Sequence, residues 1–98
     1  MKLPKKIKVG GIVYDIEITK VPDVPPLCKN HADGQVDYDK CKIFIDESLP
    51  QQLREQVLFH EIIHAIEYNN NFESEERIIQ TFASNLYQVI KDNKMLKE

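Results

Sequence analysis

Alternation of apolar and polar residues divides the first half of the chain into two predicted β-hairpins. The runs 7–9 and 12–18 alternate on either side of Gly10-Gly11, a dipeptide typical of tight hairpin turns. In the run 12–18 every second residue is an apolar or aromatic one, which predicts a strand with one face on the core. The runs 34–38 and 41–46 predict a second hairpin, joined at Asp39-Lys40.

Apolar residues in the second half recur every three or four positions, which is typical of helices. We predict one helix over residues 48–69, capped by Ser48, and a second over 74–92, capped by Ser74. Between them lies Asn69-Asn70-Asn71, which favours a turn. The Pro-rich segment 21–30 is predicted to be a loop. The pattern therefore predicts an α+β fold, with a small antiparallel sheet of two hairpins packed on two helices.

The length of 98 residues suits a single domain. We expect one domain over 1–98, with a sheet part at 1–47, a first helix at 48–69, a closing helix at 74–92 and a polar tail at 93–98. A core of this size is small, so a bound metal ion would be a useful addition to its stability.

Charge and hydropathy exclude several classes of function. The net charge is −3 and the sequence pI is about 5.6, which gives no support for nucleic-acid binding. The first residues are polar and lack the apolar region of a secretory signal, and no run is long enough to cross a membrane. Cys28 and Cys41 are then expected to be reduced thiols in a cytoplasmic protein.

The first predicted helix carries the candidate chemistry, His60-Glu61-Ile62-Ile63-His64. This H-E-x-x-H pattern is typical of zinc peptidases, because residues four apart lie on one face of a helix and can aim two imidazoles at one ion. Glu61 lies beside that face, where it can take a proton from water at the metal. An accidental pattern in a metal-free domain is the competing interpretation. The helix is apolar on nearly every side, so three ionisable groups in one buried turn would need a compensating ion.

A catalytic zinc ion usually has three protein ligands and one open position. The third ligand is sought among Glu75, Glu76 and His31. The two carboxylates are better placed, because they open the closing helix just after a tight turn. Periodicity alone does not decide between them, and an acidic first turn also stabilises a helix by about 0.3–1 kcal/mol without any metal.

A resemblance to a known family favours Glu76. The motif followed by a helical Glu resembles the gluzincin pattern of thermolysin-type peptidases, in which the ligand Glu is followed by an apolar residue two on, a Phe six on and a small residue seven on. Ile78, Phe82 and Ala83 fit that pattern when counted from Glu76. An acidic residue that orients a zinc His in that family is replaced here by Gln80, which implies an uncharged hydrogen-bond partner for the imidazole.

Nearly the whole chain is similar to the small phage- and prophage-encoded zinc peptidases, or minigluzincins, and more distantly to ImmA/IrrE-type peptidases. The stretches that carry this resemblance are 34–38, 60–64 and 82–93. It implies a minimal zincin-like domain in a bacterial host cytosol, with Zn²⁺ held by His60, His64 and Glu76 (Glu75 as the alternative), Glu61 as the catalytic base and Gln80 behind a ligand.

The expected function is zinc-dependent hydrolysis of peptide bonds. We expect the peptide substrate to lie extended along a free sheet edge, on the strand 34–38 or the strand 41–46. Tyr38, Tyr68 and Tyr87 are available to stabilise the oxyanion, although packing explains each equally well. A catalytically silent zinc-binding domain that serves as an interaction module is the alternative function. Neither nucleic acid nor a membrane is an expected partner.

Overall fold

The computed structural model describes residues 2–20 and 33–95, which form four strands and two helices. The strands are β1 (Lys6–Val9), β2 (Ile12–Thr19), β3 (Gly34–Asp37) and β4 (Lys42–Asp46). The helices are α1 (Gln51–Asn69) and α2 (Glu76–Asp92). The predicted α+β class is confirmed. The prediction of a loop at 21–30 lies outside the described residues.

The sheet has the order β1-β2-β4-β3 and is mixed, so the prediction of a purely antiparallel sheet is wrong. Both predicted hairpins form, because β1 pairs with β2 and β3 pairs with β4 in antiparallel fashion. The two hairpins join through β2 and β4, which run parallel. Parallel neighbours need a long connection, and residues 20–33 together with β3 supply one.

The order of strands places β2 and β4 in the interior of the sheet. Ile43 and Ile45 of β4 are completely buried, and β4 is hydrogen-bonded on both sides. The strand 41–46 therefore has no free edge, which rules out one of the two predicted substrate edges. In the described part of the chain β3 is an edge strand that pairs only with β4.

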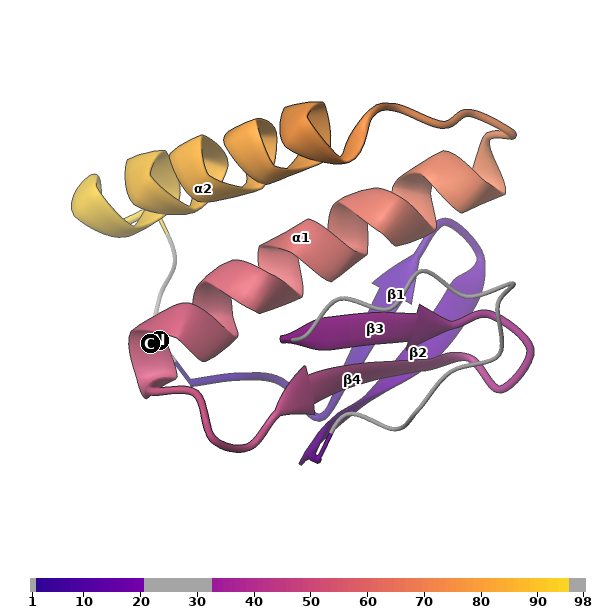
Figure 1. Cartoon of the computed structure of the whole chain (residues 1–98), viewed down its shortest axis with the longest axis horizontal. Coiled ribbons are helices and arrows are strands. Elements are labelled where there is room, and N and C mark those ends of the chain that lie inside the picture. Colours follow the sequence, from indigo (N-terminus) through magenta and orange to yellow (C-terminus); the bar gives the residue numbers. More distant parts are fainter. Residues whose placement is uncertain (1, 21–32, 96–98) are drawn as a thin grey trace.

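The helices form two layers over one face of the sheet (Figure 1). Helix α1 lies directly on the sheet, where Leu58 and Ala65 complete a core with Tyr14 and the β4 isoleucines. Helix α2 packs on the outer side of α1, and its buried apolar residues are Ile79 and Ala83. Because α1 is covered on two sides, its middle turns are removed from water. No described helix is long and apolar enough to span a bilayer.

Both helices begin later than predicted, and neither serine is the cap. Pro50 is the N-cap of α1 with φ −67°, and Glu75 is the N-cap of α2. A residue that precedes proline is disfavoured in the helical region, so Leu49 cannot continue α1 back to Ser48. The backbone N–H of Ser74 donates to Glu67 Oε1 at 3.3 Å, which engages Ser74 in the turn before α2.

Candidate metal centre

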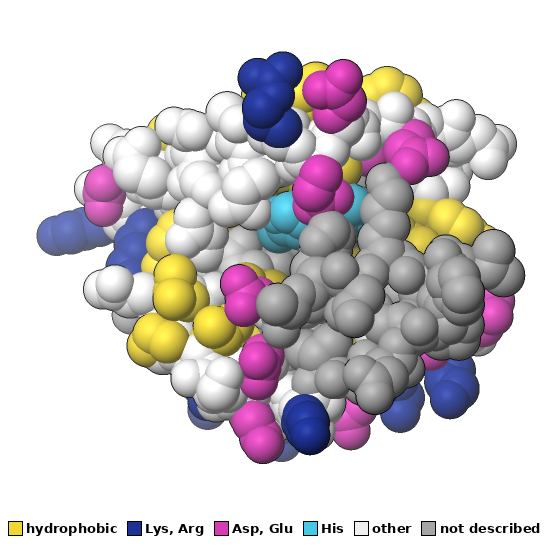
Figure 2. All heavy atoms as spheres, viewed as in Figure 1, with side chains coloured by type: hydrophobic (Ala, Val, Ile, Leu, Met, Phe, Trp, Pro, Cys, Tyr) yellow, Lys and Arg dark blue, Asp and Glu magenta, His cyan; other side chains and the backbone are white. Residues whose placement is uncertain are grey.

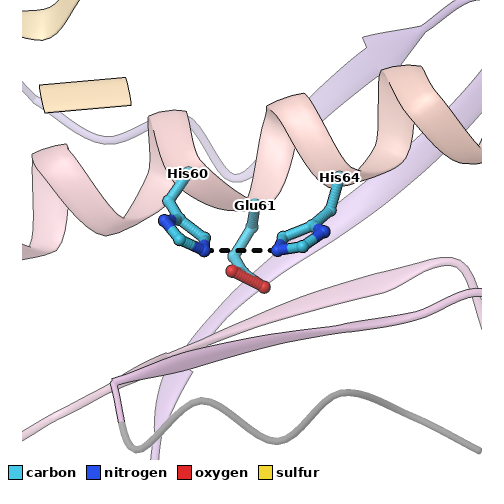
Figure 3. A group of neighbouring side chains, drawn as sticks. All are labelled: His60, Glu61 and His64. Carbon is cyan, nitrogen blue, oxygen red and sulfur yellow. Dashed lines mark hydrogen bonds between the residues drawn. The ribbon is translucent and has the colours of Figure 1, made fainter. Parts of the chain in front are cut away.

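His60, Glu61 and His64 lie together in the buried middle of α1, and one ligand atom from each falls within 4.8 Å of the other two. The two imidazoles project from the same side of the helix toward each other, with the Glu61 carboxylate between them (Figure 3). Their Nε2 atoms are 3.2 Å apart. Histidine side chains reach the surface of the molecule beside acidic side chains (Figure 2). His60 and His64 are each only 8% exposed.

Helix α2 brings Glu76 to the same point. Its carboxylate contacts His60 Nε2 closely, and its Oε2 is 3.3 Å from His64 Nε2. Glu75, the alternative third ligand, is exposed and its Oε2 lies 3.8 Å from an Arg77 guanidinium nitrogen. The contact with the imidazoles thus comes from the first residue of α2. His31, the other candidate, lies outside the described residues.

The hydrogen bond between His60 and Gln80 determines which ring nitrogen of His60 carries the hydrogen and which one presents a lone pair to the cluster. His60 Nδ1 is 2.7 Å from Gln80 Oε1, which can only accept, so Nδ1 carries the hydrogen. Gln80 is held in turn, because its Nε2 donates to Ser84 Oγ at 2.9 Å. In the neutral imidazole, Nε2 then presents a lone pair toward His64 and Glu76.

The converging atoms match the needs of a tetrahedral cation. Nitrogens bound to zinc at about 2.0–2.1 Å with tetrahedral angles are roughly 3.3–3.4 Å apart. The separations of 3.2 Å between the imidazoles and 3.3 Å from His64 to Glu76 are close to this value, and the Glu76 carboxylate stands closer than this to His60 Nε2. If a proton were added to the cluster instead of a metal ion, it could form a hydrogen bond in only one of these contacts. The donor set therefore fits a metal ion, and the group of His60, Glu61 and His64 could hold one.

Glu61 occupies the driest position of the cluster. The residue is 1% exposed, and its Oε2 has no hydrogen-bond partner among the described residues. Burial, with a smaller contribution from the negative charge of Glu76, raises the pKa of Glu61 to about 8. A carboxyl group with this pKa can both accept and release a proton near neutral pH.

Strand β3 passes close to Glu61 because it begins with a glycine. A Cβ at Gly34 would lie 2.6 Å from Val57 Cγ1 and 3.3 Å from Glu61 Cγ, so a larger residue would push the strand away from α1. The face of β3 at Gly34 is consequently held against α1 beside Glu61. Tyr38 lies just after β3. Its hydroxyl donates a hydrogen bond to the His64 carbonyl oxygen at 3.3 Å, and its ring stacks on Tyr68.

A second polar cluster, which the sequence pattern did not reveal, clamps α2 onto α1. Glu55 is 1% exposed and accepts hydrogen bonds from Tyr87 at 2.6 Å and Gln51 at 3.1 Å, with Lys91 3.5 Å away. Burial acts to raise the pKa of Glu55, but these partners more than offset it and hold the pKa below its usual value. Glu55 lies between the polar residues Arg54 and Gln56, so nothing in the sequence marks it as buried.

Tyr87→Phe is expected to lower the free energy of unfolding by about 1–3 kcal/mol, because it removes a hydrogen bond to a buried carboxylate. Urea unfolding followed by circular dichroism measures the change. Tyr68→Phe is the matched control: its ring stack with Tyr38 would remain, and we expect a change below about 0.5 kcal/mol. Equal effects of the two substitutions would contradict a clamp at Glu55.

Comparison with known proteins identifies no relative of this chain. No family model matches the chain, and no curated protein or solved structure matches it significantly. The chain is thus a small α+β domain with a buried group of His60, Glu61 and His64 at H-E-x-x-H spacing in α1. This group could bind a metal ion.

Proposed function

We propose that the chain is a zinc-dependent metallopeptidase, with the metal held by His60, His64 and Glu76. The observation that carries the proposal is the convergence of three groups: the two imidazole Nε2 atoms are 3.2 Å apart, and the Glu76 carboxylate lies 3.3–3.4 Å from His64 Nε2 and in close contact with His60 Nε2. Two nitrogens and one oxygen are a ligand set used by catalytic zinc. A zinc ion bound there would activate a water and polarise a peptide carbonyl.

Glu61 is the proposed general base. Its raised pKa, buried position and proximity to both imidazoles support transfer of a proton from the attacking water to the leaving amine. Gln80 positions His60 through the Nδ1 hydrogen bond. The edge of β3 beside Gly34 is the proposed place for an extended peptide substrate, because added strands obtain main-chain hydrogen bonds from such edges.

The neighbouring glutamates at the start of α2 provide a sharp test of the ligand assignment. Glu76→Gln is expected to weaken zinc affinity by at least about 100-fold, since it removes a charged ligand, whereas Glu75→Gln should keep zinc at one ion per chain. Competition with a chromophoric chelator and elemental analysis measure both variants. Equal affinities of the two variants would refute Glu76 as a ligand.

Digestion of a peptide library by the zinc-loaded protein tests the activity itself. We expect cleavage that stops when a chelator removes the metal and returns when zinc is restored. Stoichiometric zinc binding without any cleavage would instead support the alternative, a catalytically silent zinc-binding domain. Absence of zinc from the purified protein, together with failure to bind added zinc, would leave neither function standing.

A further inference from the structure

Helix α2 carries a row of apolar side chains that the fold leaves exposed. Ile78, Phe82, Leu86 and Val89 are 39%, 65%, 47% and 43% exposed, and they follow one another at intervals of three or four residues. We refer to these four residues as the outer stripe. Helix α2 is the outermost layer of the molecule, and no described element lies beyond it (Figure 1).

The outer stripe is distinct from the face of α2 that packs on α1. At about 100° per residue, the centre of the stripe lies roughly 85° around the helix from the centre of the buried pair Ile79 and Ala83. Glu76 and Gln80, which contact the histidines of α1, lie on the far side of Ile79 and Ala83 from the stripe. Another molecule could therefore cover the stripe and leave the metal centre unchanged.

The charges of α2 indicate what kind of surface fits the stripe. No charged residue occurs from Ile78 to Ile90. The middle of the helix therefore offers apolar contacts and no charge that a charged partner could pair with. The amino end of α2 carries an excess of negative charge, with Glu75 and Glu76 beside Arg77, and its carboxyl end an excess of positive charge, with Lys91 and Lys94 beside Asp92. A second α2 in antiparallel orientation presents the opposite charge at each end, and its helix dipole also opposes the first.

We propose that the outer stripe is a homodimer interface, in which α2 packs against α2 of a second copy about a two-fold axis that crosses the stripe midway between Phe82 and Leu86. In a two-fold symmetric interface of this kind, each pair of contacting residues occurs twice. In this register Phe82 of one copy lies beside Leu86 of the other, and Glu75 lies beside the turn that holds Lys94. The α1–α2 pairs of the two copies then form a bundle of four helices.

Light scattering after size exclusion tests the interface with the full zinc-loaded chain. Wild type is expected to be a dimer at micromolar concentration, and Phe82→Glu and Leu86→Lys are each expected to be monomers, with a dissociation constant raised at least about 30-fold. Thr81→Glu, which adds the same charge on the polar side of α2, should remain a dimer. Unchanged circular dichroism and zinc content show that each variant has folded.

Mixing the two monomeric variants tests the antiparallel register. A heterodimer of Phe82→Glu with Leu86→Lys contains one ion pair and one native Phe82–Leu86 contact, so the mixture should dimerise although neither variant does so alone. A monomeric wild type, a variant that remains dimeric, or a mixture that stays monomeric would each overturn the proposal. Binding of the wild type to neutral or anionic vesicles that Phe82→Glu abolishes, without dimer formation, would identify the stripe as a membrane contact instead.

Discussion

Glu61→Gln is expected to lower the rate of peptide cleavage by about 10²–10⁴-fold while zinc remains at one ion per chain. The amide has nearly the shape of the carboxyl group, so the packing around this 1% exposed side chain is preserved. It cannot accept the proton of the attacking water. The loss should therefore appear in kcat at saturating zinc, measured with a peptide selected from the library digest.

Glu55→Gln is the matched control, because it makes the same change at an equally buried glutamate of α1. Glu55 faces Tyr87 and Lys91 and does not contact the imidazoles in the hydrogen bonds that we describe. Its cleavage rate should stay within a few-fold of wild type in folded protein. Retention of full activity by Glu61→Gln would refute the base assignment. Loss of zinc from Glu61→Gln would show that Glu61 is a ligand of the ion, as its place within the 4.8 Å group allows.

Local sequence patterns predicted most of the elements. Hairpin turns at Gly10-Gly11 and Asp39-Lys40 and the helical spacing of the second half depend on neighbours in the chain, and all four strands and both helices are found. The helix starts were placed too early because the serines matched a capping pattern. At the start of α1, Pro50 and the restriction it places on the preceding residue act over the same few positions and override that pattern.

Contacts between residues far apart in the sequence could not be predicted from local patterns. The parallel pairing of β2 with β4 depends on how the two hairpins join, and no periodicity within either hairpin reports it. The Tyr87–Glu55 hydrogen bond joins residues that are 32 positions apart. Within the candidate site, spacing alone placed His60 and His64 on one face, whereas the choice between Glu75 and Glu76 depends on how α2 docks.

The stability of the metal-free protein is expected to fall as the pH rises, because of Glu61. Its pKa is about 8 in the folded protein and 4.5 in the reference state, so the folded chain holds this proton more tightly than the unfolded chain. Below pH 4.5 both forms are protonated and the group has no effect. Between pH 4.5 and 8 only the unfolded chain ionises, which favours unfolding, and above pH 8 the penalty is constant.

Glu61→Gln should remove this penalty, so the variant that loses activity gains stability once the metal is absent. Each pH unit within the window corresponds to about 1.4 kcal/mol, and the difference between variant and wild type should grow by about 3 kcal/mol from pH 5.5 to pH 8. Urea unfolding in the presence of a chelator at several pH values measures it.

Glu55→Gln again provides the control, with a different expected dependence on pH. The pKa of Glu55 is held below its usual value, so its carboxyl is ionised in folded and unfolded chains throughout pH 5.5–8. The difference between Glu55→Gln and wild type should then be constant across that window. A constant difference for Glu61→Gln as well would mean that the Glu61 carboxyl is solvated in the metal-free protein. Glu61 would then lack the dry position that suits it to act as a base near neutral pH.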